Sequence, residues 1–427
     1  MLQTRVTRFD DDTLHNVTSV VNSIIHVSLD IFNKLHIHRG NMKIQRIRRA
    51  SAVAVGAVLL ILSFAATPSW ASAGAATSAG CSTLPLGPAR GVWFGVNLDW
   101  ANSTLESYAT RLGHHPAVTV TFVNMPLTPR DVTNLDAAEE QVRQNGGVLL
   151  ITLEPQQGFA AVTDASVTQL VARVKSYNAQ GVPVIVRYAQ EMNGSWYPWG
   201  QDPQGYVASF RSLAKVIHSE TTCTAMAWAP NYGGGYPFSG GAYQAKPGTA
   251  AAAKLDTNND GVVDQQDDPY APYYPGDDAV DWVGLSVYHW GNKYPWGANV
   301  VPERGKFSAL ITGTYKGSIG DERAVPNFYA TYAVGHNKPM GVFETAALSM
   351  PSKGGASALS IKRAWWTQVF APSTRSKFPL IKMINWFEWN KYEVEVKGQV
   401  DWTTTQDPQV RKAFTSGLPS WLVFARP

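Results

Sequence analysis

The sequence has few charged residues and little excess of either sign. Only 16% of its 427 residues are charged, and 36 Lys and Arg against 32 Asp and Glu leave a formal net charge of +4. So small an excess argues against nucleic acid or an acidic membrane surface as the main partner. The apolar fraction of 44%, with moderate glycine and proline contents, also argues against disorder, coiled coil and collagen.

Cysteine is nearly absent, since the chain contains only Cys81 and Cys223. In an oxidising compartment these two residues can form a disulfide, and the alternative is two unpaired thiols. The sequence does not fix the geometry of the pair, so both possibilities stay open.

Long apolar runs are also scarce, and the one that stands out covers residues 50–66. Basic residues at 43–49 precede it, and the small residues Ala71-Ser72-Ala73 follow it. This order is typical of a secretory signal peptide, which we place at residues 42–73. Residues 1–41 are then a mis-assigned upstream extension, and the mature protein is secreted and not bound to a membrane. A genuine cytoplasmic extension on a signal anchor is the alternative.

Short apolar runs rich in β-branched and aromatic residues recur through the rest of the chain, and helical patterns separate them. Eight such runs alternating with helices predict a parallel sheet closed into a single (β/α)8 TIM barrel over residues 81–427. The expected strands are Val92–Asn97, Val118–Asn124, Val148–Glu154, Val184–Gln190, Ala225–Asn231, Trp282–Tyr288, Met340–Thr345 and Lys382–Phe387. The expected helices are Thr104–Leu112, Pro129–Asn145, Ser166–Gln180, Gln204–His218, Val325–Val334 and Ser357–Phe370.

A long segment follows the fifth expected strand. Residues 232–281 are rich in glycine, tyrosine and proline, and are too many for an ordinary loop. Loops of this length in compact domains are usually functional, and in a barrel a loop after a strand lies on the catalytic face. No low-complexity linker or repeat marks a second domain, and we expect a monomer.

Two acidic residues follow expected strands at the positions where barrel enzymes carry their chemistry. Glu191 comes after the fourth strand among Trp, Tyr and Asn residues, and Glu344 is the next to last residue of the seventh. Two carboxylates among aromatic side chains are what glycoside hydrolysis requires: one protonates the leaving oxygen, and the other attacks the anomeric carbon or activates water. Taken singly, each glutamate has the alternative of a surface acid or a structural ion pair.

The segment Arg187–Gly200 resembles the acid/base region of glycoside hydrolase family 26, a clan A family of endo-β-mannanases and related β-glucanases. The match is Glu191-Met192-Asn193-Gly194-Ser195-Trp196. The resemblance implies a retaining double displacement, with Glu344 as the nucleophile and Glu191 as the acid and then the base. The family usually has histidine directly before the acid/base, whereas this chain has Gln190. Its amide can hydrogen-bond a sugar hydroxyl or the nucleophile, but it cannot titrate.

The resemblance implies a secreted retaining endo-glycosidase whose partner is a β-linked polysaccharide. β-Mannan is the first expectation, and mixed-linkage β-glucan or β-xylan follow. The alternative is a non-catalytic carbohydrate-binding barrel protein, which only the departure at Gln190 favours. Catalysis needs no metal, because two carboxylates suffice.

Further substrate-binding candidates follow from their positions at strand ends. The hydroxyl of Tyr288 can hold the nucleophile ionised, and Arg187 can brace either glutamate or close a barrel layer. Weaker candidates are Asn97 and Trp100, and Glu388 is a third acid near the same face. The substrate-binding residues we expect are Arg187, Gln190, Asn193, Trp196, Trp199, Tyr288, Trp386 and Trp389, with Trp386 assigned to the barrel interior by alternation.

Residues 256–267 fit the spacing of an EF-hand calcium loop, with Gly261 at the sharp turn. The residue at the twelfth position is aspartate where a bidentate glutamate is usual, which resembles dockerin-type loops. We expect a structural calcium ion that pins the long loop, and the alternative is a solvated acidic loop. The expected ligands are Asp256, Asn258, Asp260, Val262 through its carbonyl, Asp264 and Asp267.

Overall fold

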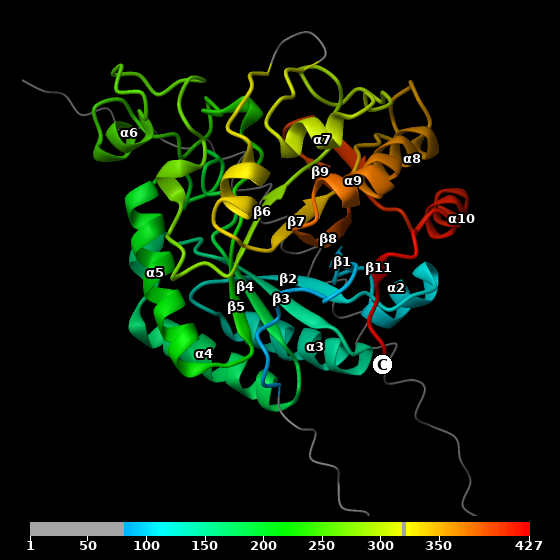
Figure 1. Ribbon diagram of the computed structural model, residues 1–427, viewed down its shortest axis with the longest axis horizontal. Helices are drawn as coiled ribbons and strands as arrows, with labels where there is room; N and C mark the ends of the chain where they lie inside the picture. The colour runs from blue at the N-terminus through cyan, green and yellow to red at the C-terminus, as the bar shows by residue number, and fades with distance from the viewer. Residues whose placement is uncertain (1–80, 318–321) are drawn as a thin grey trace, which may run out of the picture. The chain divides into compact units, whose positions relative to one another are not determined.

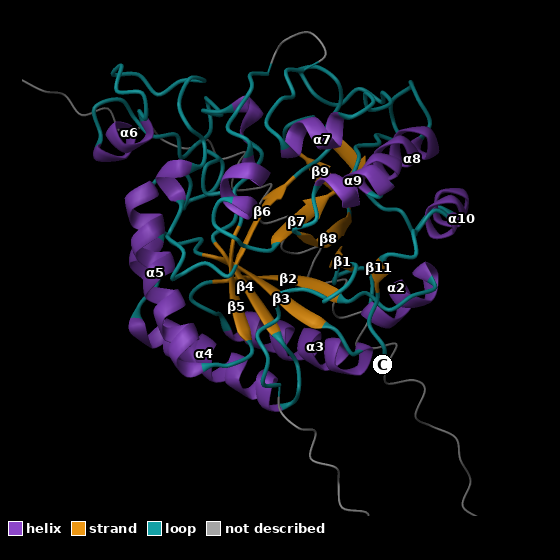
Figure 2. Ribbon diagram, viewed as in Figure 1, coloured by secondary structure: helices purple, strands orange, loops and turns teal. Residues whose placement is uncertain are grey.

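The computed structural model describes residues 81–317 and 322–427. Its centre is a closed parallel sheet, in which strands β1 to β8 pair in chain order and β1 also pairs with β8. Helices follow strands along the chain and lie outside the sheet (Figures 1 and 2). This arrangement is a (β/α)8 TIM barrel, so the predicted fold class is confirmed.

All eight predicted barrel strands are present, and their first residues agree with the prediction to within one residue. The strand β4 ends two residues before its predicted end, because Ala189 adopts a positive φ of 47° that no extended strand allows. The strands are β1 (Val92–Leu98), β2 (Val118–Asn124), β3 (Val148–Glu154), β4 (Val184–Tyr188), β5 (Thr224–Trp228), β6 (Trp282–Ser286), β7 (Met340–Thr345) and β8 (Ile381–Glu388). The short strand β11 (Leu422–Val423) pairs with the start of β1.

Several helices begin and end at capping residues that the sequence supplies. In α3, Thr128 and Asp131 form a capping box around Pro129, and Gly146 ends the helix with a φ of 76°. A helix was predicted over Val325–Val334. The structure has a shorter π-helical turn there, Tyr329–Val334. The helices are α2 (Leu105–Leu112), α3 (Pro129–Asn145), α4 (Asp164–Ala179), α5 (Pro203–Glu220), α6 (Ala250–Leu255), α7 (Lys306–Ile311), α8 (Ala358–Val369), α9 (Pro372–Lys377) and α10 (Pro408–Ser416).

Side chains on each strand alternate between the barrel interior and the layer under the helices. In β3, Val148 and Leu150 belong to the interior cluster, whereas Leu149, Ile151 and Leu153 pack in the outer one. The same alternation continues to the carboxyl end of β3, so Glu154 is an interior position.

The strand β7 departs from simple alternation. Its pairing with β6 matches Leu285 to Val342 and then Ser286 to Glu344, which leaves Phe343 as an extra residue. Such a bulge changes the direction of the following side chain. Phe343 packs in the interior cluster, and Glu344 lines the cavity above it.

The segment after β5 is long, as predicted, but it is not without structure. It contains α6 and two short 3-10 turns, Gly233–Gly235 and Ala271–Tyr273. An antiparallel hairpin of β9 (Asn390–Glu393) and β10 (Gly398–Asp401) follows β8 and was not predicted.

A disulfide joins Cys81 to Cys223, which settles the question that the sequence left open. It links the segment before β1 to the residue that precedes β5, across 142 positions.

We expect the double variant Cys81→Ser/Cys223→Ser to lose about 2–4 kcal/mol of unfolding free energy, because closing so long a loop restricts the unfolded chain. Chemical denaturation with and without reductant measures this. If the reductant lowered the unfolding free energy of the double variant as much as that of the wild type, the disulfide would not be the cause, and the prediction would be contradicted.

The expected signal peptide at residues 42–73 and the expected extension at residues 1–41 lie outside the described residues. Within the described ranges, none of the helices combines the length and the apolarity that crossing a membrane requires.

Candidate active site

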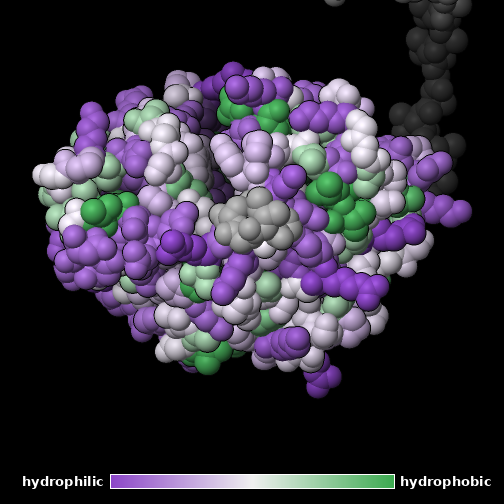
Figure 3. Space-filling view, turned by 90° about the horizontal axis from the view of Figure 1, so that it is seen from above, coloured by the Kyte–Doolittle hydropathy of each residue, from purple (hydrophilic) through white to green (hydrophobic). Residues whose placement is uncertain are grey.

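A cavity of about 640 Å³ opens at the carboxyl ends of the barrel strands. This is the face on which barrel enzymes carry their chemistry. Seen from above, the molecule has a mostly hydrophilic surface, and the hydrophobic patches on the face shown are small and separated (Figure 3). The cavity is lined by acidic and aromatic side chains, among them Glu154, Glu191, Glu344, Glu393, Trp196, Tyr197, Tyr288, Trp290, Phe387, Trp389 and Trp402.

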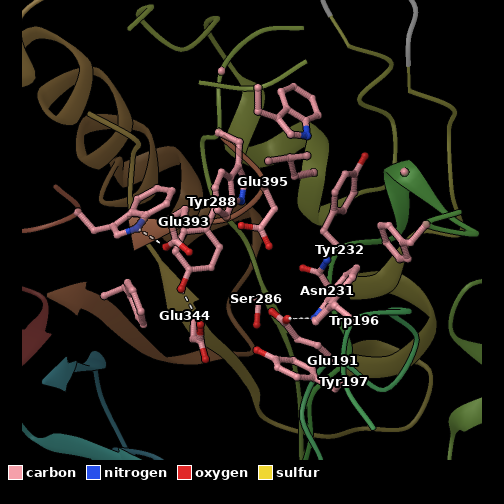
Figure 4. A pocket seen from close by; sticks show the side chains of 18 of the residues that line it. Glu191, Trp196, Tyr197, Asn231, Tyr232, Ser286, Tyr288, Glu344, Glu393 and Glu395 are labelled. Atoms are coloured by element: carbon pink, nitrogen blue, oxygen red, sulfur yellow. Dashed lines mark hydrogen bonds between the residues drawn. The ribbon is translucent and has the colours of Figure 1, made fainter. Parts of the chain in front are cut away.

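Glu344 is held between a cation and a phenol. Arg187 donates from Nη1 to Glu344 Oε1 at 2.5 Å. The Tyr288 hydroxyl donates to Glu344 Oε2 at 2.5 Å, as Figure 4 shows. Arg187 is fully buried and also donates to Ser286 Oγ at 3.0 Å. The guanidinium places a buried positive charge directly beside the Glu344 carboxylate. Each oxygen of Glu344 thus accepts a hydrogen bond. The bond from the Tyr288 hydroxyl is the one that the sequence predicted.

Glu191 faces the same cavity from the loop after β4 (Figure 4). Trp196 donates from Nε1 to Glu191 Oε2 at 3.1 Å. Burial, reinforced by the charge of Glu344 and partly offset by Arg187, raises the pKa of Glu191 to about 7. Below about pH 7 this carboxyl therefore mostly carries a proton that it can donate.

The backbone of this loop is strained. Glu191 has a φ of 55°, which is uncommon for a residue other than glycine, and it follows Ala189 at 47°. The strain is held by hydrogen bonds, since Glu191 N donates to Ala229 O at 2.8 Å. Strained backbone of this kind clusters at functional sites because it re-aims side chains.

Two predicted substrate contacts support the loop instead of lining the cavity. Asn193 is fully buried and exchanges two hydrogen bonds with the backbone of Asn231, both at 2.8 Å. Trp199 is fully buried, donates to the Gln190 carbonyl at 2.7 Å, and stacks on Tyr197. The prediction that they contact the substrate is corrected, because their polar atoms are used within the protein.

Gln190 does not donate a hydrogen bond to Glu344, the expected nucleophile. It is 2% exposed, and its Nε2 donates to Glu154 Oε1 at 2.8 Å. The resemblance left open a hydrogen bond to Glu344 or to a sugar hydroxyl, and the structure directs the amide to a third carboxylate.

The aromatic residues near β8 are arranged differently from the prediction. Trp386 is fully buried and packs against Phe370 and Phe414 under the helices, so its assignment to the barrel interior is wrong. Met383 belongs to the interior cluster and Trp386 to the outer one, so the inward-facing residues of β8 are the odd-numbered ones. The prediction had placed an even-numbered residue inside. Phe387 and Trp389 line the cavity with nearly parallel rings, 5.8 Å apart.

Glu388 lies on the outer side of β8, away from the cavity. Its two oxygens accept four hydrogen bonds from the amides and hydroxyls of Thr404 and Thr405, at 2.6–3.1 Å. This acid joins β8 to the segment before α10. Of the weaker candidates, Asn97 donates to the Phe343 carbonyl and Trp100 to the Val120 carbonyl, and neither lines the cavity.

Several residues of the cavity were not singled out in the sequence. Glu154 is the last residue of β3 and Glu344 the next to last of β7, so the same strand-end argument would have found Glu154. Glu393 and Trp402 come from the unpredicted hairpin and the turn after it, and Trp402 Nε1 donates to Glu393 Oε1 at 2.8 Å. No local pattern distinguishes that contact, because it depends on how the hairpin folds over the barrel.

In the predicted calcium loop, the acidic oxygens contact backbone amides. Asp256 accepts from Asp260 N and Gly261 N, and Asp267 accepts from Thr257 N and Asp264 N. Among the described residues, no three His, Cys, Asp or Glu side chains gather closely enough to hold a metal ion. Calcium binding therefore stays a prediction.

If the loop binds calcium, chelation is expected to lower the melting temperature and leave activity at low temperature nearly unchanged, because the ion would be structural. The measurement is a thermal melt with and without excess EGTA. Asp260→Ala, which removes the side-chain oxygens of an expected ligand, should lose most of the EGTA effect. A melting temperature that EGTA does not change would contradict the prediction.

A barrel whose cavity holds one carboxyl with a raised pKa beside a second carboxyl bonded to a buried guanidinium has the arrangement of a glycoside hydrolase. The comparisons with known proteins agree with this class. The model of glycosyl hydrolase family 26 matches residues 150–229, which include β4 and Glu191. Endoglucanase H of Acetivibrio thermocellus is 22% identical over 341 residues, covering 77% of this chain. The chain spans only 30% of the length of that curated relative.

Two solved structures show the same fold. An endo-beta-1,4-mannanase double mutant from Cellulomonas fimi matches with a TM-score of 0.50 and 15% identity, covering 78% of this chain and 72% of that one. GH26C from Muricauda sp. matches with a TM-score of 0.50 and 13% identity, covering 78% and 87%. The family-model match and the curated relative support the predicted resemblance to glycoside hydrolase family 26, and the solved structures support the fold.

Proposed function

We propose that the chain is a secreted retaining endo-glycosidase that hydrolyses a β-linked polysaccharide, with Glu344 as the nucleophile and Glu191 as the acid/base. The observation that carries this proposal is the contrast between the two carboxyls in one cavity. Glu344 is bonded to Arg187 and Tyr288, whereas burial raises the pKa of Glu191 to about 7. Pairs of carboxyls pushed toward opposite protonation states divide into acid and nucleophile.

In the first step, the Glu344 carboxylate attacks the anomeric carbon, and Glu191 gives its proton to the departing glycosidic oxygen. The products of this step are a glycosyl ester on Glu344 and the free aglycone end. In the second step, Glu191 takes a proton from water, the water oxygen attacks the anomeric carbon, and Glu344 leaves as a carboxylate.

The electrostatics explain how Glu191 changes role. The negative charge of Glu344 is one cause of its raised pKa. That charge disappears when Glu344 becomes an ester, so the pKa of Glu191 falls in the intermediate. Glu191 therefore holds its proton before the first step. Once it has given that proton to the leaving oxygen, it stays ionised and can act as the base of the second step.

β-Mannan is the first substrate to test, and mixed-linkage β-glucan and β-xylan follow. The names of two similar proteins support these choices, since one is an endo-beta-1,4-mannanase and another an endoglucanase. The aromatic side chains of Trp196, Trp389 and Phe387 give flat apolar faces on which sugar rings can stack. We propose that the protein acts as a monomer and that calcium, if bound, takes no part in the chemistry.

The experiment is reducing-sugar release by the purified protein from β-mannan, mixed-linkage β-glucan, β-xylan and chitin. Glu191→Gln and Glu344→Gln are compared with Glu106→Gln, an exposed acid in the first turn of α2. Activity on one polymer that both site variants lose and Glu106→Gln retains supports the proposal. Binding without hydrolysis would instead support the carbohydrate-binding alternative.

A further inference from the structure

We propose that Glu154, positioned by Gln190, determines specificity by accepting hydrogen bonds from free hydroxyl groups of the sugar bound beside Glu344. This inference rests on the proposed function and deepens it, because it identifies which chemical groups the substrate must present. The substrate class it implies is a polymer of neutral sugars with an unsubstituted hydroxyl at this position.

The location of Glu154 follows from the strand on which it lies. It is the last residue of β3 and an interior position, and it lines the same cavity as Glu191 and Glu344. Its strand pairs with β4, where Thr152 is matched to Arg187, the partner of Glu344. The charge of Glu344 also reaches Glu154, since it is one of the causes that raise the pKa of Glu154. A sugar over Glu344 therefore has Glu154 as a neighbour.

The partners of Glu154 are neutral and leave room for more donors. Gln190 Nε2 donates to Oε1 at 2.8 Å, and Gln156 Nε2 donates to Oε2 at 3.3 Å. Within residues 81–317 and 322–427, no ion pair is formed with Glu154. Each carboxylate oxygen can accept about two hydrogen bonds, so both oxygens keep acceptor capacity.

The position of Glu154 is built into the protein. Gln190 is 2% exposed, and its Oε1 atom is buried without a hydrogen-bond partner. A buried amide oxygen left unpaired costs free energy, so the conformation must be held by its other contacts. Gln190 is the positioning residue, because its amide fixes one oxygen of Glu154 and cannot change charge with pH.

Hydroxyl groups are the donors that fit this carboxylate. Burial is the main cause of the raised pKa of Glu154, so the site disfavours any further negative charge. Six glutamates and two lysines line the cavity, which makes it acidic in a chain of net charge +4. A uronate at this position would be repelled, and an O-acetyl group would remove the donor. A free sugar hydroxyl supplies the hydrogen bond without adding charge.

The test combines enzyme variants with substrate analogues. Wild-type protein, Glu154→Gln and Gln190→Leu are assayed on an oligosaccharide of the polymer that is hydrolysed best, and on analogues that each lack one hydroxyl. We expect Glu154→Gln to lower kcat/KM by about 10- to 100-fold, because a hydrogen bond to a charged group is lost. For the wild type, kcat/KM on one deoxy analogue should be lower than on the parent oligosaccharide by a similar factor. For Glu154→Gln, kcat/KM should be almost the same on both substrates. Gln190→Leu should weaken discrimination at the same hydroxyl.

The proposal would be overturned if each missing hydroxyl lowered kcat/KM by the same factor in the wild type and in Glu154→Gln. It would also be overturned if Glu154→Gln had the kcat/KM of the wild type on the parent oligosaccharide. If Glu154→Gln does not fold, Glu154→Asp and Gln190→Leu give the same comparison. If the wild type hydrolyses nothing, the proposed function fails, and calorimetry of oligosaccharide binding then decides this inference separately. Weaker binding by Glu154→Gln than by wild type supports it, and equal or absent binding overturns it.

Discussion

Glu344→Gln is expected to lower kcat on the polysaccharide by on the order of 10⁴-fold or more, because an amide cannot form the glycosyl ester. Arg187 is fully buried and donates to this carboxylate, so the variant also leaves a buried cation without its partner. We therefore expect a lower melting temperature as well. Single-turnover kinetics together with a thermal melt separate the two effects.

The loss of kcat in Glu344→Gln can be assigned to the chemical step if the folded variant still binds substrate. Isothermal calorimetry with an oligosaccharide should give an affinity close to that of the wild type at a temperature where the variant is folded. Glu106→Gln carries the same chemical change on an exposed helix turn and should keep full activity. Retention of more than about one hundredth of wild-type kcat by Glu344→Gln would show that another residue is the nucleophile.

Glu191→Gln is expected to lower kcat/KM on the polysaccharide by about 10²- to 10⁴-fold, because the leaving oxygen is no longer protonated. The loss should be much smaller for a glycoside with a strongly acidic phenol as its leaving group, which departs without a proton. This dependence on the leaving group distinguishes a missing acid from a misfolded site. Equal losses on both substrates would argue against the acid role.

The same residue predicts the pH profile. Burial and Glu344 raise the pKa of Glu191 to about 7, and the acid form is the active one. In wild-type protein, kcat/KM should therefore be retained below pH 7 and fall as the pH rises through about 7, since the proton is lost there. In Glu191→Gln this alkaline limb should disappear. An alkaline limb that is the same in both proteins would assign it to another group.

The barrel was predictable because its evidence is local. Each strand is a short run of β-branched and aromatic residues, and all eight runs are strands in the structure. The convergence of Glu191 and Glu344 in one cavity follows from the same rule, since the carboxyl ends of parallel strands meet on one face. Positions close to a strand end could be assigned to a face without any knowledge of packing.

The contacts that depend on packing were not predictable. Aromatic residues occur on both sides of β8, so the sequence did not reveal that Trp386 faces the helices while Phe387 faces the cavity. The bulge in β7 that turns Glu344 into the cavity leaves no mark in the sequence. The hydrogen bond from Gln190 to Glu154 joins residues on neighbouring strand ends, and only the closed sheet brings them together.

The central claim is that Glu344 carries the sugar during the reaction, and covalent labelling tests it most directly. The protein is incubated with a 2-deoxy-2-fluoro glycoside that has a good leaving group, which slows release of the glycosyl ester, and the labelled peptide is sequenced by mass spectrometry. The account predicts one adduct per chain, on Glu344, and none in Glu344→Gln. An adduct on Glu154, Glu191 or Glu388, or turnover with inversion at the anomeric carbon, would contradict it.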